Sequence, residues 1–290
     1  MHGITEQEIF ESLRPRLFGL GYRMLGIRAD AEDVVQEAWM RWQAAEKSAL
    51  RSAEAWLVTV TTRLAIDRLR AARAEREAYV GSWLPEPLVA EDERTPEAAI
   101  EHADDISLAF LLMLERLAPE ERAAFLLRQV FDYDYPEIAS ILGKSEAALR
   151  QAVHRARERL RADEPRFHVP AETHRRLLER FVEAARSGKR DAIRALLDEN
   201  ARVIGDGGGK VPTVAGGMYG ADRVTNLYWA LALKYGQRLD YRIATVNGEP
   251  GLLRFIDGAL ESAQAVATDG ARIGAFYVVR NPDKLARIRV

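Results

Sequence analysis

The stretch "DYPEIASILGKSEAALRQAVHRARERLRA", from Asp134 to Ala162, predicts two helices joined by a tight turn. Pro136 suits the first turn of a helix, Gly143 can supply the turn, and Ser145 can cap the next helix. The second helix has apolar residues at steps of four, three and four, the spacing of one buried face: Leu149, Val153, Ala156 and Leu160. A short helix, a glycine turn and a longer helix make a helix-turn-helix, a motif that reads DNA.

The charge of this stretch also favours DNA binding. From Lys144 to Arg161 there are six basic and two acidic residues, a local balance of +4, although the whole chain carries −2. The early residues of such a helix usually contact base edges, and later arginines contact phosphates. The face expected to be exposed carries Glu146, Arg150, Gln151, His154, Arg155 and Arg157. The alternative is a helical hairpin within a bundle, with a solvated basic face.

An earlier stretch, "ADAEDVVQEAWMRW" (Ala29–Trp42), predicts a helix with Asp30 as its N-cap. Val35, Trp39 and Trp42 fall on one face. The opposite face carries Asp33, Gln36, Glu37 and Arg41, which from the pattern alone is either a binding surface or a solvated one.

The stretch "AEAWLVTVTTRLAIDRLRAARAERE" (Ala53–Glu77) predicts a long helix that is apolar on one side. Its arginines gather on the other side and towards the C-terminal end: Arg63, Arg68, Arg70, Arg73 and Arg76. Such a row suits phosphate contacts, although basic residues near a helix C-terminus also interact favourably with the helix dipole.

The fold class expected is multidomain, with two all-α modules followed by an α+β module. Residues 81–104 hold Pro85, Pro87, Pro96 and many acids, a composition typical of a linker. After two helical stretches, at about 171–187 and 190–198, several runs are typical of strands: "ARVIG", "DYRIATV", "LLRFI", "ESAQAVAT" and "RIGAFYVV".

Composition excludes several classes. The chain has no cysteine, and its five histidines show no HExxH spacing, so we expect neither disulfides nor a metal or other cofactor. The start, "MHGITEQEIF", does not read as a signal peptide, and the longest apolar run, "ISLAFLLML", is too short to cross a bilayer. We therefore expect a cytoplasmic protein without membrane contact.

The two helical modules together resemble an extracytoplasmic-function (ECF) sigma factor, which directs bacterial RNA polymerase to promoters. Residues 1–80 resemble its region 2, with "ADAEDVVQEAWMRW" as the core-binding helix and "AWLVTVTTRLAIDRLR" as the promoter-melting helix. Residues 105–163 resemble its region 4, which contains the helix-turn-helix. The resemblance implies RNA polymerase core, through its β and β′ subunits, and promoter DNA as partners.

The resemblance also implies roles for particular residues. Asp33, Gln36 and Glu37 would bind the clamp helices of the β′ subunit. The loop "KSALRSAEA" and three helical residues would hold the melted −10 element: Arg63, Asp67 and Arg70. On the recognition helix, Glu146, Arg150 and His154 would read the −35 element. Arg155 and Arg157 would make further contacts with DNA.

Three further motifs resemble an ECF subgroup with a fused C-terminal domain of the SnoaL-like, NTF2-like type, a curved sheet wrapped over helices, here residues 168–290. They are "WLPEP" (Trp83, Leu84, Pro85, Glu86, Pro87), "DGGGK" (Asp206, Gly207, Gly208, Gly209, Lys210) and "NPDKL" (Asn281, Pro282, Asp283, Lys284, Leu285). The resemblance implies that the fused domain regulates the sigma factor from within the same chain.

The WLPEP segment (Trp83–Pro87) should be stiff, because Leu84 and Glu86 each precede a proline and are biased to extended backbone. Trp83 and Leu84 offer apolar area that needs a partner. We expect the segment to dock near DGGGK and NPDKL and to fix the spacing of the two DNA-binding modules. Alternatively, Trp83 packs on the adjacent helix of its own module, and the three glycines form a plain hairpin turn. DGGGK lacks the spacing of a phosphate-binding loop.

Other function classes stay open at this point. NTF2-like cones include isomerases and cyclases that use a buried Asp or His as general base, and the strand region offers Asp206, Asp222 and Asp257. A pocket that senses a small ligand without chemistry is a further alternative. A transcriptional repressor would use the helix-turn-helix but would not explain the first module. We expect a sigma factor that is not an enzyme.

Overall fold

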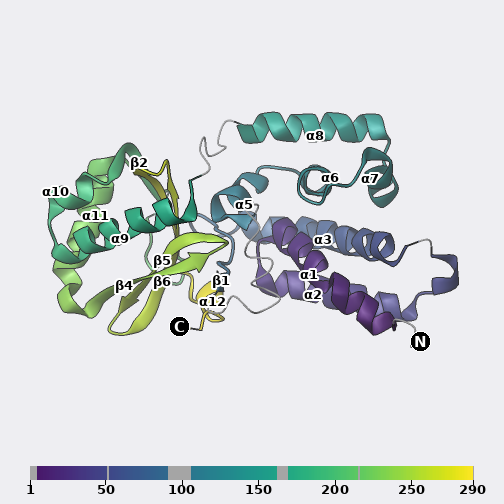
Figure 1. Cartoon of the computed structure of the whole chain (residues 1–290), viewed down its shortest axis with the longest axis horizontal. Helices are drawn as coiled ribbons and strands as arrows, with labels where there is room; N and C mark the ends of the chain where they lie inside the picture. The colour runs from purple at the N-terminus through teal and green to yellow at the C-terminus, as the bar shows by residue number, and fades with distance from the viewer. Residues whose placement is uncertain (1–4, 51, 91–105, 162–168, 215, 290) are drawn as a thin grey trace. The chain divides into compact units, whose positions relative to one another are not determined.

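The computed structural model describes residues 5–50, 52–90, 106–161, 169–214 and 216–289 of the 290-residue chain. These residues form two compact units (Figure 1). The first comprises 5–77 and 110–161, and the second comprises 78–90, 106–109 and 169–289. The segment that follows the first three helices therefore belongs with the C-terminal part of the chain.

The first unit begins with α1 (Glu6–Leu25), α2 (Arg28–Ala44), the short 3-10 helix η1 (Lys47–Ala49) and α3 (Ala53–Glu77). Thr5 and Glu8 form a capping box that starts α1, and Gly26 ends it in the left-handed conformation. The apolar face expected for α2 is inside, since Val35 and Trp42 are buried.

The expectation that Asp30 caps α2 is wrong. The helix begins at Arg28, one turn earlier than the acidic signal suggested, after an extended Ile27 that makes no side-chain cap. Asp30 lies in the first turn and accepts a hydrogen bond from Arg68 Nη2 at 2.6 Å. Its carboxylate thus links α2 to α3.

The second helical group consists of α5 (Leu108–Leu114), α6 (Pro119–Gln129), α7 (Tyr135–Leu142) and α8 (Glu146–Arg161). A capping box between Asp134 and Glu137 starts α7, and Gly143 at φ 64° ends it. Ser145 Oγ then accepts a hydrogen bond from the amide of Ala148. The apolar face predicted for α8 is buried: Leu149, Val153, Ala156 and Leu160.

The second unit is a seven-stranded sheet in the order β1-β4-β5-β6-β7-β2-β3. Its neighbouring strands are antiparallel except β2 and β7, which are parallel. The strands are β1 (Val89–Ala90), β2 (Leu197–Asp206), β3 (Met218–Tyr219), β4 (Leu239–Val246), β5 (Glu249–Ile256), β6 (Ala259–Thr268) and β7 (Ile273–Val279). The five strand-like runs of the sequence fall in β2, β4, β5, β6 and β7.

Helices of this unit are α9 (Ala171–Ser187), α10 (Arg190–Arg194), α11 (Ala221–Tyr235) and α12 (Pro282–Leu285), with a 3-10 turn η3 (Gly236–Arg238). The rings of Phe181 on α9, Tyr228 on α11 and Phe276 on β7 meet with centroids 4.8–5.0 Å apart, so both helices cover one face of the sheet. The helix expected to reach residue 198 ends at Arg194, because β2 begins at Leu197.

Part of the opposite face of the sheet is covered by other segments. Leu253, Phe255 and Ala263 form a small buried cluster there, against which Val89 and Leu285 pack. Val89 also pairs with Val246, so the chain that follows the WLPEP segment adds an edge strand to the C-terminal sheet. Part of the 81–104 segment expected to be a linker is thus built into the second unit, and its acidic remainder, 91–104, lies outside the described residues. Within the described ranges, no helix is long and apolar enough to cross a membrane.

Candidate functional site

The basic face of α8 is on the surface, as the sequence analysis expected. Arg150 and His154 are exposed, and Arg150 donates to Glu146 Oε2 at 2.6 Å while lying 4.5 Å from the centre of the Tyr135 ring. Tyr135 and Glu146 together hold the guanidinium at the start of the helix. This is the end of a recognition helix that contacts base edges in a helix-turn-helix.

Farther along α8 the arginines contact α6. Arg157 Nε donates to Gln129 Oε1 at 3.1 Å, and Arg159 Nη1 lies 2.7 Å from Glu121 Oε2. Arg155 is more distant from the same carboxylate, at 3.7 Å. The three guanidiniums are largely exposed, so phosphates could compete for them.

On α2, the residues expected to bind polymerase lie opposite the buried face. Asp33 and Gln36 are exposed, and Glu37 is half-buried and receives a hydrogen bond from Arg41 at 2.9 Å. The surface is polar and rests on a rigid apolar base, in which Trp42 lies 5.5 Å from Trp56 on α3.

The residues expected to hold melted DNA on α3 contact the second helical group. Arg63 Nε donates to the Ile141 carbonyl on α7 at 3.1 Å, and Arg70 forms an ion pair with Glu120 on α6. The bond to Glu120 raises the pKa of Arg70. Asp67 is exposed and accepts from Arg70 Nη1 at 3.2 Å. Arg63 and Arg70 thus bind the second helical group, whereas Asp67 pairs with Arg70 of its own helix.

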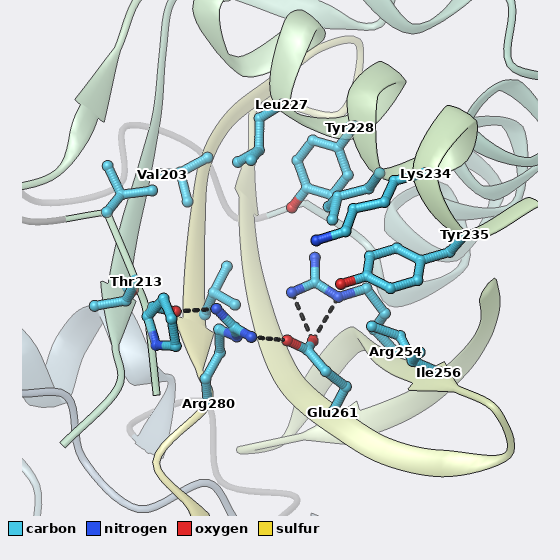
Figure 2. A pocket seen from close by; sticks show the side chains of 15 residues that line it. Val203, Thr213, Leu227, Tyr228, Lys234, Tyr235, Arg254, Ile256, Glu261 and Arg280 are labelled. Carbon is cyan, nitrogen blue, oxygen red and sulfur yellow. Dashed lines mark hydrogen bonds and ion pairs between the residues drawn. The ribbon is translucent and has the colours of Figure 1, made fainter. Parts of the chain in front are cut away.

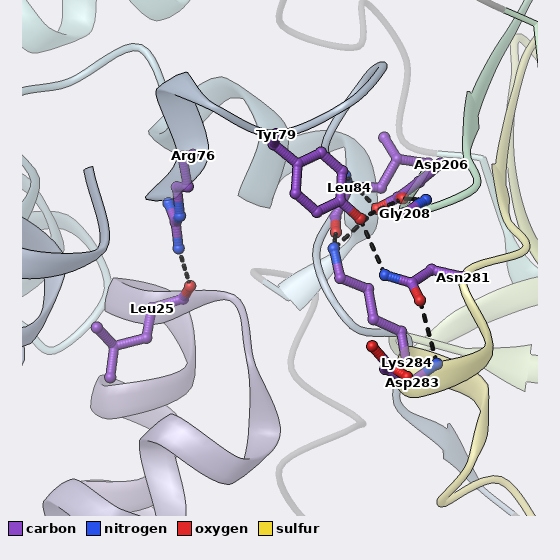
Figure 3. Close-up of polar contacts among 9 residues, drawn as sticks. All are labelled: Leu25, Arg76, Tyr79, Leu84, Asp206, Gly208, Asn281, Asp283 and Lys284. Atoms are coloured by element: carbon purple, nitrogen blue, oxygen red, sulfur yellow. Dashed lines mark hydrogen bonds and ion pairs between the residues drawn. The ribbon is translucent and has the colours of Figure 1, made fainter. Parts of the chain in front are cut away.

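A buried charge cluster that the sequence analysis missed joins the same helices. Arg122 on α6, only 1% exposed, donates to the Met24 carbonyl at the end of α1 at 2.7 Å and lies 2.8 Å from Glu115. Arg76 on α3 pairs with Glu115 and donates to the Leu25 carbonyl (Figure 3). Two arginines thereby bind the carbonyl end of α1, where cations are favoured.

In the second unit, the WLPEP segment meets both C-terminal motifs at the carboxylate of Asp206, which is fully buried at the end of β2 (Figure 3). Asp206 Oδ2 accepts from the Leu84 amide at 2.9 Å and from Lys284 Nζ at 2.7 Å. Its Oδ1 accepts from Tyr79 Oη at 2.6 Å and from the Gly208 amide at 3.0 Å. One carboxylate therefore joins three segments that are far apart in the sequence.

Lys284 and Asn281 complete this cluster. Lys284 Nζ also donates to the Leu84 carbonyl and lies 4.4 Å from the centre of the Trp83 ring. Asn281 Nδ2 donates to Tyr79 Oη at 2.9 Å. Burial and the hydrogen bond to Asp206 raise the pKa of Tyr79, so the phenol stays a donor.

The glycines of DGGGK are explained by close approach. A Cβ on Gly208, whose φ is 63°, would lie 2.5 Å from the Asn281 side chain. At the surface, Lys210 of the same motif lies 2.6 Å from Asp283 of NPDKL. The two motifs thus form one structure, and DGGGK is not a plain hairpin turn.

Most of the WLPEP segment is buried. Of the two apolar residues expected to need a partner, Leu84 is fully buried, whereas Trp83 is only partly buried beneath Lys284. Pro85, Glu86, Pro87 and Leu88 are also buried.

Asn247, in the β4–β5 turn, holds the end of this segment and was not anticipated. Its backbone amide donates to the Leu88 carbonyl at 2.8 Å. Its side-chain Oδ1 accepts from the Leu88 amide at 3.1 Å, and its side-chain Nδ2 donates to the Ile106 carbonyl at 3.1 Å. Residues 88 and 106 are therefore tied to one side chain.

The carboxylates considered as general bases lie elsewhere. Asp206 is engaged in the cluster just described, Asp222 is exposed and lies 3.2 Å from Arg194, and Asp257 is exposed beside Arg238. None of the three lines the cavity that lies between α11 and the sheet. Over the ranges that the structure describes, no His, Asp and Glu group could hold a metal ion.

Two helical groups with a helix-turn-helix, followed by an α+β domain, define a DNA-binding transcription factor, and comparison with known proteins identifies its class. The family models described as Sigma-70 region 2 and Sigma-70, region 4 match residues 9–75 and 107–160. The chain is 38% identical over 286 residues to the ECF RNA polymerase sigma factor SigJ of Mycobacterium tuberculosis, covering 95% of this chain and 91% of the relative. It is 30% identical over 279 residues to the probable ECF sigma factor SigI of the same species, covering 95% and 93%.

A crystal structure of M. tuberculosis SigJ matches with a TM-score of 0.78 at 35% identity, covering 97% of this chain and 98% of that one. The chain belongs to the ECF RNA polymerase sigma factors, whose function is promoter-directed initiation of transcription. The expected fold class, two all-α sigma modules and a C-terminal α+β domain, is confirmed.

Proposed function

We propose that the chain binds RNA polymerase core through the polar face of α2 and promoter DNA through α3 and α8. Asp33, Gln36 and Glu37 contact the β′ subunit in this proposal, and Glu146, Arg150 and His154 read the −35 element. Four of these six residues are exposed (Asp33, Gln36, Arg150 and His154), and together with the fixed position of Arg150 this supports the assignment. Arg155 and Arg157 contact phosphates.

The −10 element binds Arg63, Asp67 and Arg70 only after a rearrangement of the first unit. The contacts of Arg63 with Ile141 and of Arg70 with Glu120 support a resting state in which α6 and α7 cover part of α3. Arg122 and Arg76 stabilise this state through Glu115. Polymerase core and DNA then select an open state of the same unit.

The C-terminal domain controls the sigma factor through the WLPEP segment. The observation that carries this proposal is the buried Asp206 carboxylate, which accepts from Leu84, Lys284 and Tyr79 at once. When the WLPEP segment is docked, it restrains the chain between region 2 and region 4. When the segment is released, the two regions can take other separations. Activity follows the population of the docked form.

In vitro transcription with polymerase core and a promoter library tests this function. The chain should select promoters that share a −10 and a −35 element. Core enzyme that gives the same transcripts with and without the chain would refute the proposal. Binding of core by a chain that selects no promoter would refute the DNA-binding assignments alone.

A further inference from the structure

The C-terminal domain contains a cavity of about 450 Å³ between α11 and the sheet (Figure 2). The volume lies within the range of small-molecule sites, roughly 300–1,000 Å³. Most of the wall is apolar, formed by the aliphatic residues Val203, Leu227, Leu231, Ile256 and Val278 together with the rings of Tyr228 and Tyr235.

One end of this cavity is charged and has an excess of cations. Arg254, 5% exposed, lies with Nε and Nη2 each 2.6 Å from Glu261 Oε2. Arg280 Nη2 lies 2.5 Å from the other oxygen of the same carboxylate. Lys234, from α11, lines the same cavity, and in Figure 2 its amino group points into it.

The charges lining the cavity do not balance. Burial alone would raise the pKa of Glu261, but the guanidinium of Arg254 and that of Arg280 hold it below its usual value. Glu261 is therefore ionised and compensates one of three cations, which leaves two positive charges beside an apolar wall. Lys234 is exposed at this end of the cavity and Arg280 is partly exposed, so both can form charge-assisted contacts with an anion that enters the cavity.

We propose that the cavity binds a medium-chain monocarboxylic acid. The carboxylate lies between Lys234 and the Arg254–Glu261–Arg280 cluster, and the hydrocarbon chain lies along Leu227, Leu231 and Val203. An inorganic anion would leave the apolar wall unused, and a neutral alcohol would leave the cations uncompensated.

Occupancy of the cavity acts on the WLPEP segment, a part of the inference that rests on the proposed regulation. The cavity residues Gly205 and Arg280 directly adjoin Asp206 and Asn281 in the sequence. The amides of Arg280 and Asn281 both donate to the Asp206 carbonyl, at 2.7 and 3.0 Å. A carboxylate that attracts the Arg280 guanidinium therefore acts on the residue pair that holds the segment.

Calorimetric titration of the full chain with decanoate, below its micelle concentration, tests the binding. We expect saturable binding of one decanoate, at least about tenfold tighter than decanol, since a charge-assisted contact is lost in the alcohol. Inorganic phosphate should not bind. Equal binding of decanol, binding of phosphate, or no saturable binding of decanoate would each overturn the proposed ligand class.

A variant on the surface of α11 locates the site. Lys234→Gln should weaken decanoate roughly fivefold or more and leave decanol unchanged, because glutamine keeps the helix and removes only the charge. Lys189→Gln, an exposed lysine that does not line the cavity, is the matched control. Undiminished decanoate binding by Lys234→Gln would overturn the assigned position.

Limited proteolysis between residues 89 and 103 tests the coupling separately. Saturating decanoate should change the cleavage rate in the natural chain and leave it unchanged in Asp206→Asn, where the segment is already released. Normal decanoate binding with an unchanged cleavage rate in the natural chain would overturn the coupling and leave the ligand site standing.

Discussion

Asp206 and Lys284, 78 positions apart in the sequence, form a buried ion pair with Nζ 2.7 Å from Oδ2. The side chains are 0% and 7% exposed. Both atoms also bind the backbone of Leu84, through its amide and its carbonyl. The regulatory proposal depends on this arrangement, because it fixes the WLPEP segment by its main chain.

Removal of one charge from this pair should destabilise the second unit strongly. Asp206→Asn leaves the Lys284 ammonium buried without its counter-ion, and we expect a loss of about 3–5 kcal/mol in urea unfolding. Asp283→Asn breaks the exposed pair with Lys210 and should cost less than about 1 kcal/mol. Equal losses of unfolding free energy in the two variants would show that the buried pair stabilises the domain no more than the exposed pair does.

The recognition helix should separate base reading from phosphate contact. Arg150→Ala should cost about 1–3 kcal/mol on promoters with the preferred −35 base and much less on others. Arg157→Ala should weaken all sequences alike and lower the slope of log K against log salt by about one. Fluorescence anisotropy with −35 variants measures both effects, with Arg175→Ala on α9 as control. Uniform losses in both variants would contradict the assignment.

The polar face of α2 should bind polymerase. Asp33→Ala with Gln36→Ala removes no buried contact, so the melting temperature should stay the same while co-elution with core enzyme decreases. Glu11→Ala, an exposed acid on α1, is the matched control. A double variant that co-elutes and transcribes normally would make this face an ordinary solvated surface.

Stability should depend on pH through His174 on α9. Burial lowers the pKa of His174 to about 4, and its Nε2 is buried without a hydrogen-bond partner among the described residues. Between about pH 6.5 and pH 4 the unfolded chain binds a proton that the folded chain lacks. The contribution of His174 to stability is therefore greatest above about pH 6.5, and the free energy of unfolding decreases by up to about 1.4 kcal/mol for each unit by which the pH is lowered in this range.

Urea unfolding across this pH range, with His174→Leu and with the exposed His154→Gln as control, measures the effect. The Leu variant should show a smaller decrease below pH 6.5, and the His154 variant should behave like the natural chain. A Leu variant with the full decrease would assign the pH dependence to other groups.

Much of the fold could be predicted from the sequence, because its signals are local. Pro136, Gly143 and Ser145 determine the helix-turn-helix within a few residues, and each has the expected position. The stiffness of the WLPEP segment also follows from its prolines. The sequence does not show that Leu84 is buried more deeply than the larger Trp83, because burial depends on the distant segments that surround the two side chains.

The missed residues depend on contacts between distant segments. Asn247 reads as half of an Asn-Gly turn, and nothing local indicates that it binds residues 88 and 106. Arg122 looks like an ordinary basic residue of an amphipathic helix, yet it is buried on the carbonyl end of α1. The roles of Asn247 and Arg122 become visible only once the three-dimensional positions of the segments that they contact are known.

Transcription by variants in which the WLPEP segment is released tests the central claim most directly. Leu84→Ala should release the WLPEP segment, at a cost of about 2–5 kcal/mol to docking, and Trp83→Ala should have a smaller effect of the same kind. Deletion of the chain after Arg280 removes Lys284 and should also release it. Leu233→Ala, at an exposed site of the same domain, is the control.

The transcript yield with polymerase core should change in the same direction for all three of these variants, and most for Leu84→Ala and the deletion. The rate of proteolytic cleavage between residues 89 and 103 should increase in parallel. The Leu233→Ala variant should match the natural chain in both assays. Unchanged transcript yield from Leu84→Ala, together with unchanged cleavage, would show that the WLPEP segment is only a linker and would contradict control by the C-terminal domain.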